Sequence, residues 1–264
     1  MIRLWLAAWA VILPAAAGSG APLPALRVGM DPRSLPSIYV PGLDYSREDS
    51  RKDPQLTPAQ IQRLEGFEVE VLHALADKLA VNPVVVPTSW FALEPGLVAK
   101  RFDLILSSWT PGDGTPPGVV ASDPYWEWGL VVAVRAKDER IRTLADLAGR
   151  RLGQFDDPSV TRPVRVMATS LGAQLVPGDD GSLLFRWLEA GTVDAVLFDS
   201  PYVRWRVSRS QAFRIVGEPL NRLGYHVGVR REDGALLARV NGALKALRDS
   251  GELSRIRRKW EGGS

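Results

Sequence analysis

Short apolar runs alternate with amphipathic stretches along the chain from residue 26 onward. Apolar residues recur at helical spacing from Gly66 to Leu79, and the run from Phe102 to Leu106 is almost continuously apolar. Strands are predicted at 26–30, 83–87, 102–106, 130–134, 151–155, 193–198, 213–216 and 225–229, and helices at 66–79, 91–100, 183–189, from 200 onward, 236–247 and 253–260. This alternation predicts an α/β fold whose sheets are mostly parallel and flanked by helices.

The first residues of the chain have the pattern of an export signal. Met1-Ile2-Arg3 is a short basic start, and an apolar stretch from Leu4 to Ala17 ends in three small residues. The stretch is shorter than the roughly 20 residues of a membrane span. The pattern predicts a signal peptide within residues 1–21, cleaved near Ala17 or at Ala21. An uncleaved N-terminal anchor is the alternative.

The 264-residue chain contains no cysteine. An exported chain without cysteine has no disulfide and no thiol for a lipid anchor, so its core alone must hold it together. A chain of this length can bury a sufficient core. We therefore expect a soluble, monomeric protein of the Gram-negative periplasm.

Motifs for catalysis, metal binding and nucleic-acid binding are not evident in the sequence. The net charge of +3 is spread along the chain, without the basic stripe of a nucleic-acid binder. There is no nucleophile elbow or phosphate loop, and two histidines without cysteine do not suggest zinc. Asp156-Asp157 and Asp179-Asp180 are interpreted as turn and capping residues. We therefore expect no catalytic residue, no metal and no cofactor.

Aromatic residues are the clearest candidates for a ligand site. The chain has nine tryptophans, and Trp90 and Trp109 lie near the ends of predicted strands, where α/β folds open their cleft. Ligand pockets combine such aromatic walls with a few polar groups. The alternative is that most of these rings fill the core.

One segment interrupts the alternation of strands and helices. Residues 41–65 carry many charges and few large apolar side chains, and a short helix is predicted at 58–64. We interpret 41–65 as a surface insertion, with the reservation that long loops often carry function. This segment is called the insertion below.

Six blocks in order resemble family 3 of the bacterial solute-binding proteins, the polar amino acid class of ABC importers. They are Leu-Arg-Val-Gly-Met-Asp (26–31), Gly-Phe-Glu-Val-Glu-Val (66–71), Phe-Asp-Leu-Ile-Leu-Ser-Ser (102–108), Ser-Asp-Pro-Tyr (122–125), Val-Asp-Ala-Val-Leu-Phe-Asp-Ser-Pro (193–201) and the tail 247–260. The resemblance implies two α/β lobes that close on a ligand. Lobe 1 would comprise 24–126 and 222–264, lobe 2 would comprise 130–217, and two crossing segments would join them.

The resemblance also implies ligand-facing positions. They are Asp31, Trp90 as an aromatic platform, Ser108, Thr110, and Asp199 as the carboxylate that holds an ammonium group. Thr115 stands where the family usually has an arginine that clamps the ligand's α-carboxylate. Arg33 or Arg162 could replace that clamp.

Three function classes follow from these observations. The first is the binding protein of an ABC importer, which captures a small polar solute carrying an amine and delivers it to a membrane permease. The second is an accessory periplasmic protein for a redox system such as a quinoprotein alcohol dehydrogenase, which would need no ligand clamp. The third is an enzyme, because Val-Pro-Thr-Ser-Trp (86–90) is similar to cyclohexadienyl dehydratases, although Gly153 to Pro158 does not match their pattern.

Overall fold

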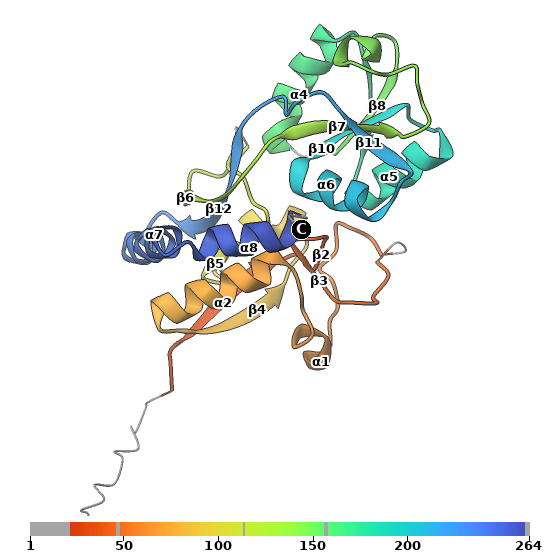
Figure 1. Cartoon of the computed structure of the whole chain (residues 1–264). Coiled ribbons are helices and arrows are strands. Elements are labelled where there is room, and N and C mark those ends of the chain that lie inside the picture. The colour runs from red at the N-terminus through yellow and green to blue at the C-terminus, as the bar shows by residue number, and fades with distance from the viewer. Residues whose placement is uncertain (1–21, 46–47, 113, 156–157, 262–264) are drawn as a thin grey trace, which may run out of the picture.

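Two five-stranded sheets, each flanked by helices, form two lobes (Figure 1). The computed structural model describes residues 22–261 except 46–47, 113 and 156–157, so the predicted signal peptide lies outside it. Lobe 1 has the strand order β4-β1-β5-β12-β6 and lobe 2 the order β11-β7-β10-β8-β9. The two-lobed α/β architecture expected from the sequence is confirmed.

The strands and helices of lobe 1 come from both ends of the chain. They are β1 (Ala25–Met30), β4 (Asn82–Pro87), β5 (Leu104–Ile105), β6 (Val119–Trp128), β12 (Leu223–Arg230), α2 (Phe67–Leu79), α3 (Leu93–Val98), α7 (Gly234–Asp249) and α8 (Glu252–Trp260). A small hairpin of β2 (Arg33–Ser34) and β3 (Ile38–Tyr39) follows β1, and α1 (Pro58–Ile61) lies in the insertion.

The elements of lobe 2 are continuous in the sequence. They are β7 (Leu130–Arg135), β8 (Arg151–Phe155), α4 (Pro158–Ser170), β9 (Gln174–Gly178), α5 (Gly181–Ala190), β10 (Ala195–Asp199), α6 (Ser200–Arg209) and β11 (Phe213–Val216). In the described part of the chain, no helix is long and apolar enough to cross a membrane.

Both sheets contain as many antiparallel as parallel pairings. In lobe 1, β1 pairs in parallel with β4 and β5, while β12 runs antiparallel to β5 and β6. In lobe 2, β8 pairs in parallel with β9 and β10, while β7 runs antiparallel to β10 and β11. The sequence led us to expect mostly parallel sheets. The antiparallel pairings involve the strands next to the two connections between the lobes. The chain enters lobe 2 from β6 to β7 and returns to lobe 1 from β11 to β12.

Helix α2 forms where the apolar spacing predicts it. Its buried face includes Val71, Leu72, Leu75 and Leu79, each at most 6% exposed. These side chains recur every three or four residues, so they lie on one face of the helix and pack against the sheet of lobe 1. Burial of each such side chain stabilises the fold by about 1.5–3 kcal/mol.

The two connections between the lobes lie side by side. The first passes through Gly129 between β6 and β7, and the second comprises residues 217–222 between β11 and β12. The backbone N–H of Leu130 donates to Asn221 Oδ1 at 2.8 Å, and the N–H of Leu220 donates to the carbonyl of Leu130 at 2.8 Å. A Cβ on Gly129 would lie 2.3 Å from the carbonyl oxygen of Asn221. Gly129 therefore lets the two connections approach closely.

Gly129→Ala is expected to lower the free energy of unfolding by about 1–3 kcal/mol, because the new methyl group must push the two connections apart. Urea unfolding followed by circular dichroism measures this effect. Gly242→Ala in α7 is the matched control, since a Cβ at this position meets nothing within 4 Å. It replaces a glycine inside a helix by alanine, which has the higher helix propensity. Equal stability of the two variants would contradict a steric role for Gly129.

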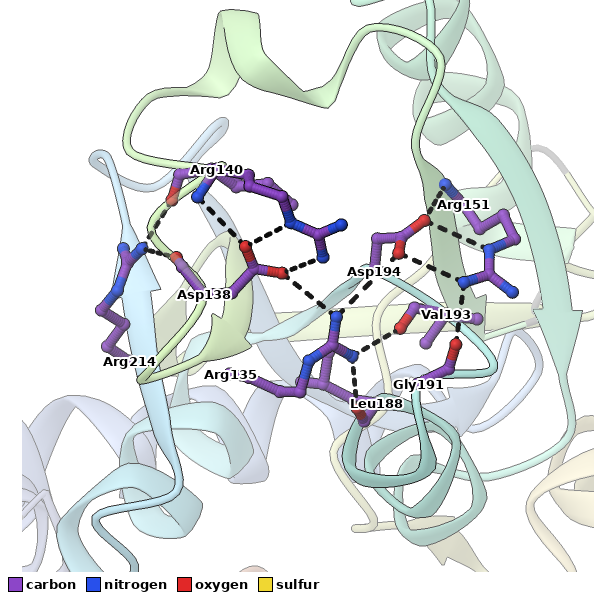
Figure 2. Close-up of polar contacts among 10 residues, drawn as sticks. Arg135, Asp138, Arg140, Arg151, Leu188, Gly191, Val193, Asp194 and Arg214 are labelled. Carbon is purple, nitrogen blue, oxygen red and sulfur yellow. Dashed lines mark hydrogen bonds and ion pairs between the residues drawn. The ribbon is translucent and has the colours of Figure 1, made fainter.

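A network of arginines and carboxylates joins the strand ends of lobe 2 that lie opposite the carboxyl ends of β8 and β10 (Figure 2). Arg135, the last residue of β7, donates to the carbonyls of Leu188 at 2.6 Å and Val193 at 2.9 Å. The same guanidinium group lies 3.1 Å from Asp138 and 3.9 Å from Asp194. Figure 2 also shows Arg140, Arg151 and Arg214 bound to the same cluster. Hydrogen bonds from Arg140 and Arg135 hold the pKa of Asp138 well below its usual range.

Five elements were not predicted from the sequence: the strands β2, β3, β6 and β9 and the helix α4. Helix α4 contains Pro163 and several β-branched residues, which have low helix propensity, and β9 contains Pro177. Strand β9 is an edge strand, where proline is tolerated because one side of the strand needs no hydrogen-bond donor. The predicted helix at 91–100 is shorter than expected, with a 3₁₀ turn at Trp90–Ala92 followed by α3.

Candidate ligand-binding site

A cavity of about 380 Å³ lies between the lobes, and side chains from both lobes line it. On the lobe 2 side it opens at the carboxyl ends of β8 and β10, where α/β folds place their ligands. Five of the predicted site residues line the cavity: Asp31, Trp90, Ser108, Thr110 and Asp199. This volume suits a small molecule.

Aromatic rings of both lobes meet at one wall of the cavity. Phe155, the last residue of β8, makes an edge-to-face contact with Trp90 of lobe 1 at 5.7 Å between ring centroids. It also lies 6.1 Å from Phe91 and 5.9 Å from Phe198. Phe155 therefore joins the aromatic residues of lobe 1 to those of lobe 2 across the cleft.

Trp90→Ala is expected to weaken solute binding by about 1–3 kcal/mol, because it removes a large apolar wall of the cavity and the contact with Phe155. Isothermal titration calorimetry measures the change. Trp187→Ala is the control, since this tryptophan belongs to lobe 2 but does not line the cavity. An affinity unchanged by Trp90→Ala would remove Trp90 from the site.

Asp199 is held in place by the element that follows it. It ends β10 and caps α6, with its Oδ1 accepting a hydrogen bond from the N–H of Tyr202 at 2.8 Å. The side chain of Tyr225, from β12 of lobe 1, also hydrogen-bonds to it. Burial raises the pKa of Asp199 to about 7, against the lowering effect of these two hydrogen bonds. A cationic group placed against Asp199 would supply the missing counter-charge.

Ser108 and Thr110 use their polar groups mainly within the protein. The N–H of Ser108 donates to Glu68 and its hydroxyl to that of Ser37 at 2.7 Å. The hydroxyl of Thr110 donates to the carbonyl of Gly224 at 2.8 Å. These two residues fix the shape of the lobe 1 side of the cavity. The side chain of Thr110 can offer a ligand only an acceptor.

Asp31 forms a buried ion pair with Arg33. The guanidinium Nε and one Nη of Arg33 each lie 2.8 Å from a carboxylate oxygen of Asp31, and the two side chains are 11% and 6% exposed. The remaining N–H groups donate to backbone carbonyls of the insertion, those of Asp49, Ser50 and Lys52. All five donors of Arg33 are therefore used, and it cannot serve as the carboxylate clamp suggested from the sequence. The side chain of Arg162 lies outside the described residues.

Trp109 and Thr115 are not brought to the cavity. Trp109 is 1% exposed in the core of lobe 1, and its indole N–H donates to Glu94 at 2.9 Å. Thr115 donates to the same carboxylate at 3.0 Å and accepts from the N–H of Gly112. The expectation that these two side chains face the ligand is therefore corrected. The chain leaves β5 through Ser108 in the left-handed region (φ 51°), which the sequence does not reveal.

The insertion contributes side chains to the lining of the cavity as well as to the protein surface. Its residues Leu43, Tyr45, Glu48 and Ser50 line the cavity. Figure 1 shows this segment leaving the β2–β3 hairpin and extending beside lobe 2. It is fixed to lobe 1 by Ser89, whose hydroxyl donates to the carbonyl of Ser50 at 2.7 Å.

The insertion also contacts lobe 2. The guanidinium group of Arg51 lies over the ring of Phe91 at 4.7 Å and forms an ion pair with Asp179 of lobe 2 at 3.4 Å. Both partners of the ion pair are exposed to solvent. The insertion thus reaches across the mouth of the cleft.

Acidic groups outnumber basic ones around the cavity. Its described lining holds six carboxylates and three guanidinium groups: Asp31, Asp44, Glu48, Asp179, Asp180 and Asp199 against Arg33, Arg186 and Arg206. Asp31 and Arg33 neutralise one another. Asp180 caps α5, as predicted for this acidic pair, through the N–H of Leu183. The remaining excess of negative charge favours a cationic ligand.

Two lobes joined by paired crossings, with a lined cavity between them, define the class of two-lobed solute-binding proteins. The family model for bacterial extracellular solute-binding proteins, family 3, matches residues 52–263. The chain belongs to this family, as the resemblance of the six sequence blocks led us to expect.

Individual relatives and a solved structure are similar to the chain over most of its length. The chain is 28% identical over 202 residues to the L-cystine-binding protein TcyJ of Escherichia coli strain K12, covering 76% of this chain and 75% of that protein. It is 26% identical to the L-arginine-binding protein of Pseudomonas aeruginosa, covering 75% of this chain and 80% of that protein. An ancestral arginine-binding protein bound to arginine superposes with a TM-score of 0.72 at 27% identity, covering 90% of this chain and 98% of that one.

Proposed function

We propose that the chain is the periplasmic solute-binding component of an ABC importer and that it binds a small polar solute carrying a cationic nitrogen. The observation that carries this proposal is the position of Asp199 in a cavity whose lining has twice as many carboxylates as guanidinium groups. A charge-assisted hydrogen bond between an ammonium group and Asp199 would be shielded from water by both lobes. The names of the arginine-binding relatives support the same ligand class.

The proposal includes the cellular location of the chain, its oligomeric state and its partners. Export through a signal peptide in residues 1–21 and cleavage would give a soluble monomer in the periplasm. The closed, loaded form would deliver its solute to the membrane permease of the importer. No nucleic acid and no cofactor takes part.

The missing clamp narrows the solute class further. Thr115 stands at the family's arginine position and Arg33 is fully engaged, so an α-carboxylate loses its usual partners on the lobe 1 side. On the lobe 2 side the cavity is lined by two guanidinium groups, those of Arg186 and Arg206, and by a larger number of carboxylates, three. Solutes that carry a cation without a free α-carboxylate are therefore favoured over glutamate and aspartate.

A panel titration tests the proposal. The mature protein is titrated with putrescine, agmatine, L-arginine, L-cystine, L-glutamate and L-aspartate, and tryptophan emission reports closure of the lobes. We expect micromolar or tighter binding of a cationic member and none of the acidic ones. Tight binding of glutamate or aspartate would refute the charge argument, and absence of any binding would favour the accessory role.

Enzymatic activity is tested separately. We expect no turnover of prephenate or arogenate by the purified protein, because the relatives named above are transport binding proteins. Formation of the aromatic product, measured by chromatography, would show a cyclohexadienyl-dehydratase-like enzyme instead.

A further inference from the structure

Gln154 is a buried polar residue in the lining of the cavity that the sequence did not single out. It lies in β8 and is 3% exposed. Its side-chain oxygen has no hydrogen-bond partner among the described residues. A buried acceptor left without a partner costs about 1–3 kcal/mol. A ligand in the cavity can remove this cost by donating a hydrogen bond.

The described residues that surround Gln154 in the sheet and the cavity wall are apolar. Leu197 of β10 is its neighbour in the parallel pairing of the two strands. Leu130 and Val164, which also line the cavity, belong to the same apolar cluster as Leu197. The amide therefore projects a single polar group from an otherwise apolar part of the wall.

The strand register relates Gln154 to Asp199. Gln154 pairs with Leu197, and Asp199 follows Leu197 by two residues on the same strand. Neighbouring residues of paired strands and residues two apart on one strand face the same side of a sheet, so all three side chains share one face. A rise of about 3.3 Å per residue and a strand spacing of about 4.8 Å place the backbone positions of Gln154 and Asp199 about 8 Å apart.

We propose that Gln154 determines specificity by accepting a hydrogen bond from a second nitrogen of the solute while Asp199, whose backbone position lies about 8 Å away, holds the first. This inference rests on the proposed binding of a cationic solute at Asp199. It assigns the preferred solutes to compounds with a nitrogen at each end of a short chain, such as diamines. A second positive charge is compatible with the excess of carboxylates in the lining.

The experiment compares two probes of equal length in two proteins. Cadaverine carries an ammonium group at both ends of five carbons, a span of about 7–8 Å, and pentylamine carries only one. Wild type is expected to bind cadaverine about 10- to 100-fold more tightly than pentylamine. Gln154→Leu should weaken cadaverine about 10- to 100-fold and pentylamine by less than about threefold, since only cadaverine uses the amide.

Two controls separate a binding role from a structural one. Gln174→Leu changes an exposed glutamine of the same sheet and should leave both affinities unchanged. Without ligand, the Gln154→Leu variant should unfold at a temperature equal to or above that of wild type, because it removes a buried amide oxygen that has no hydrogen-bond partner among the described residues. A lower unfolding temperature would show that the amide has a structural partner and would overturn the inference.

The outcomes also separate this inference from the proposed function. Equal binding of cadaverine and pentylamine by wild type, or an unchanged preference in Gln154→Leu, overturns the role of Gln154 and leaves the cationic site intact. If neither amine nor any cationic member of the titration panel binds to wild type, the proposed function fails and the role of Gln154 fails with it.

Discussion

Asp199→Asn is expected to weaken binding of a cationic solute by about 2–5 kcal/mol, or about 30- to 5,000-fold at pH 8. The substitution keeps the shape of the side chain and removes the charge that would pair with the ammonium group inside the cavity. Asparagine can still cap α6 by accepting the hydrogen bond of Tyr202. Calorimetric titration with the tightest-binding cationic solute measures the loss.

The stability of the ligand-free variant distinguishes this effect from misfolding. Burial raises the pKa of Asp199 to about 7, well above the value of an aspartate in an unfolded chain. The ionised carboxylate therefore opposes folding at pH 8, and this cost is absent below about pH 3, where the group is protonated in both states. Asp199→Asn should raise the unfolding temperature at pH 8 while it lowers affinity. A fall in both quantities would indicate structural damage.

The affinity of the wild-type protein should depend on pH through the same group. A cation binds the ionised carboxylate, so affinity should be constant above about pH 8 and fall about tenfold per unit below pH 6. Other titratable groups interact with Asp199 or its hydrogen-bond partners: Tyr202, Tyr225, Glu68, Tyr125, Asp180 and Arg206. Burial also raises the pKa of Glu68 to about 7. The pH dependence of Asp199→Asn isolates the contribution of Glu68.

Arg33→Met is expected to lower the free energy of unfolding by about 3–5 kcal/mol, because it leaves Asp31 buried without its counter-ion. It also removes the three hydrogen bonds to carbonyls of the insertion. We expect the insertion to become the first site of cleavage in limited proteolysis, and solute binding to weaken as that wall of the cavity loosens. Urea unfolding and mass spectrometry of the fragments measure both effects.

Arg51→Met is the matched control for Arg33→Met. Arg51 lies in the same region, but its ion pair with Asp179 is exposed and contributes little to stability. Its removal should leave the unfolding free energy within about 0.5 kcal/mol of wild type. A stability loss for Arg33→Met no larger than that of the control would show that the buried pair does not anchor the insertion.

The fold was predictable wherever the apolar pattern was strong. The spacing of Val71, Leu72 and Leu75 identified α2, and the apolar run before Leu106 located β5. Helix α4 escaped prediction because Pro163 and several β-branched residues disfavour a helix, and β9 because Pro177 disfavours a strand. Tertiary packing overrides those preferences.

The candidate site was predictable in part, for reasons of backbone geometry. Position in the sequence blocks identified Asp199, and position near the end of the predicted strand 83–87 identified Trp90; both line the cavity. It could not show that the backbone at Ser108 adopts a positive φ, which accompanies the burial of Trp109 in the core. The proposed role of Gln154 had one visible signal, a polar residue inside the predicted strand 151–155. The engagement of Arg33 with the insertion depends on contacts across many residues and has no local sequence signal.

The double attachment of Asp199 has a kinetic consequence. Because Tyr202 and Tyr225 already orient the carboxylate, it loses little rotamer freedom when a cation arrives. We expect the residence time of a bound cation to depend mainly on the rate at which the lobes open. The ion pair of Arg51 with Asp179 spans the mouth of the cleft and is exposed, so mobile ions weaken it more than they weaken the buried contact at Asp199. Rising ionic strength should therefore weaken the Arg51–Asp179 pair at the rim of the cleft and shorten the residence time of a captured solute.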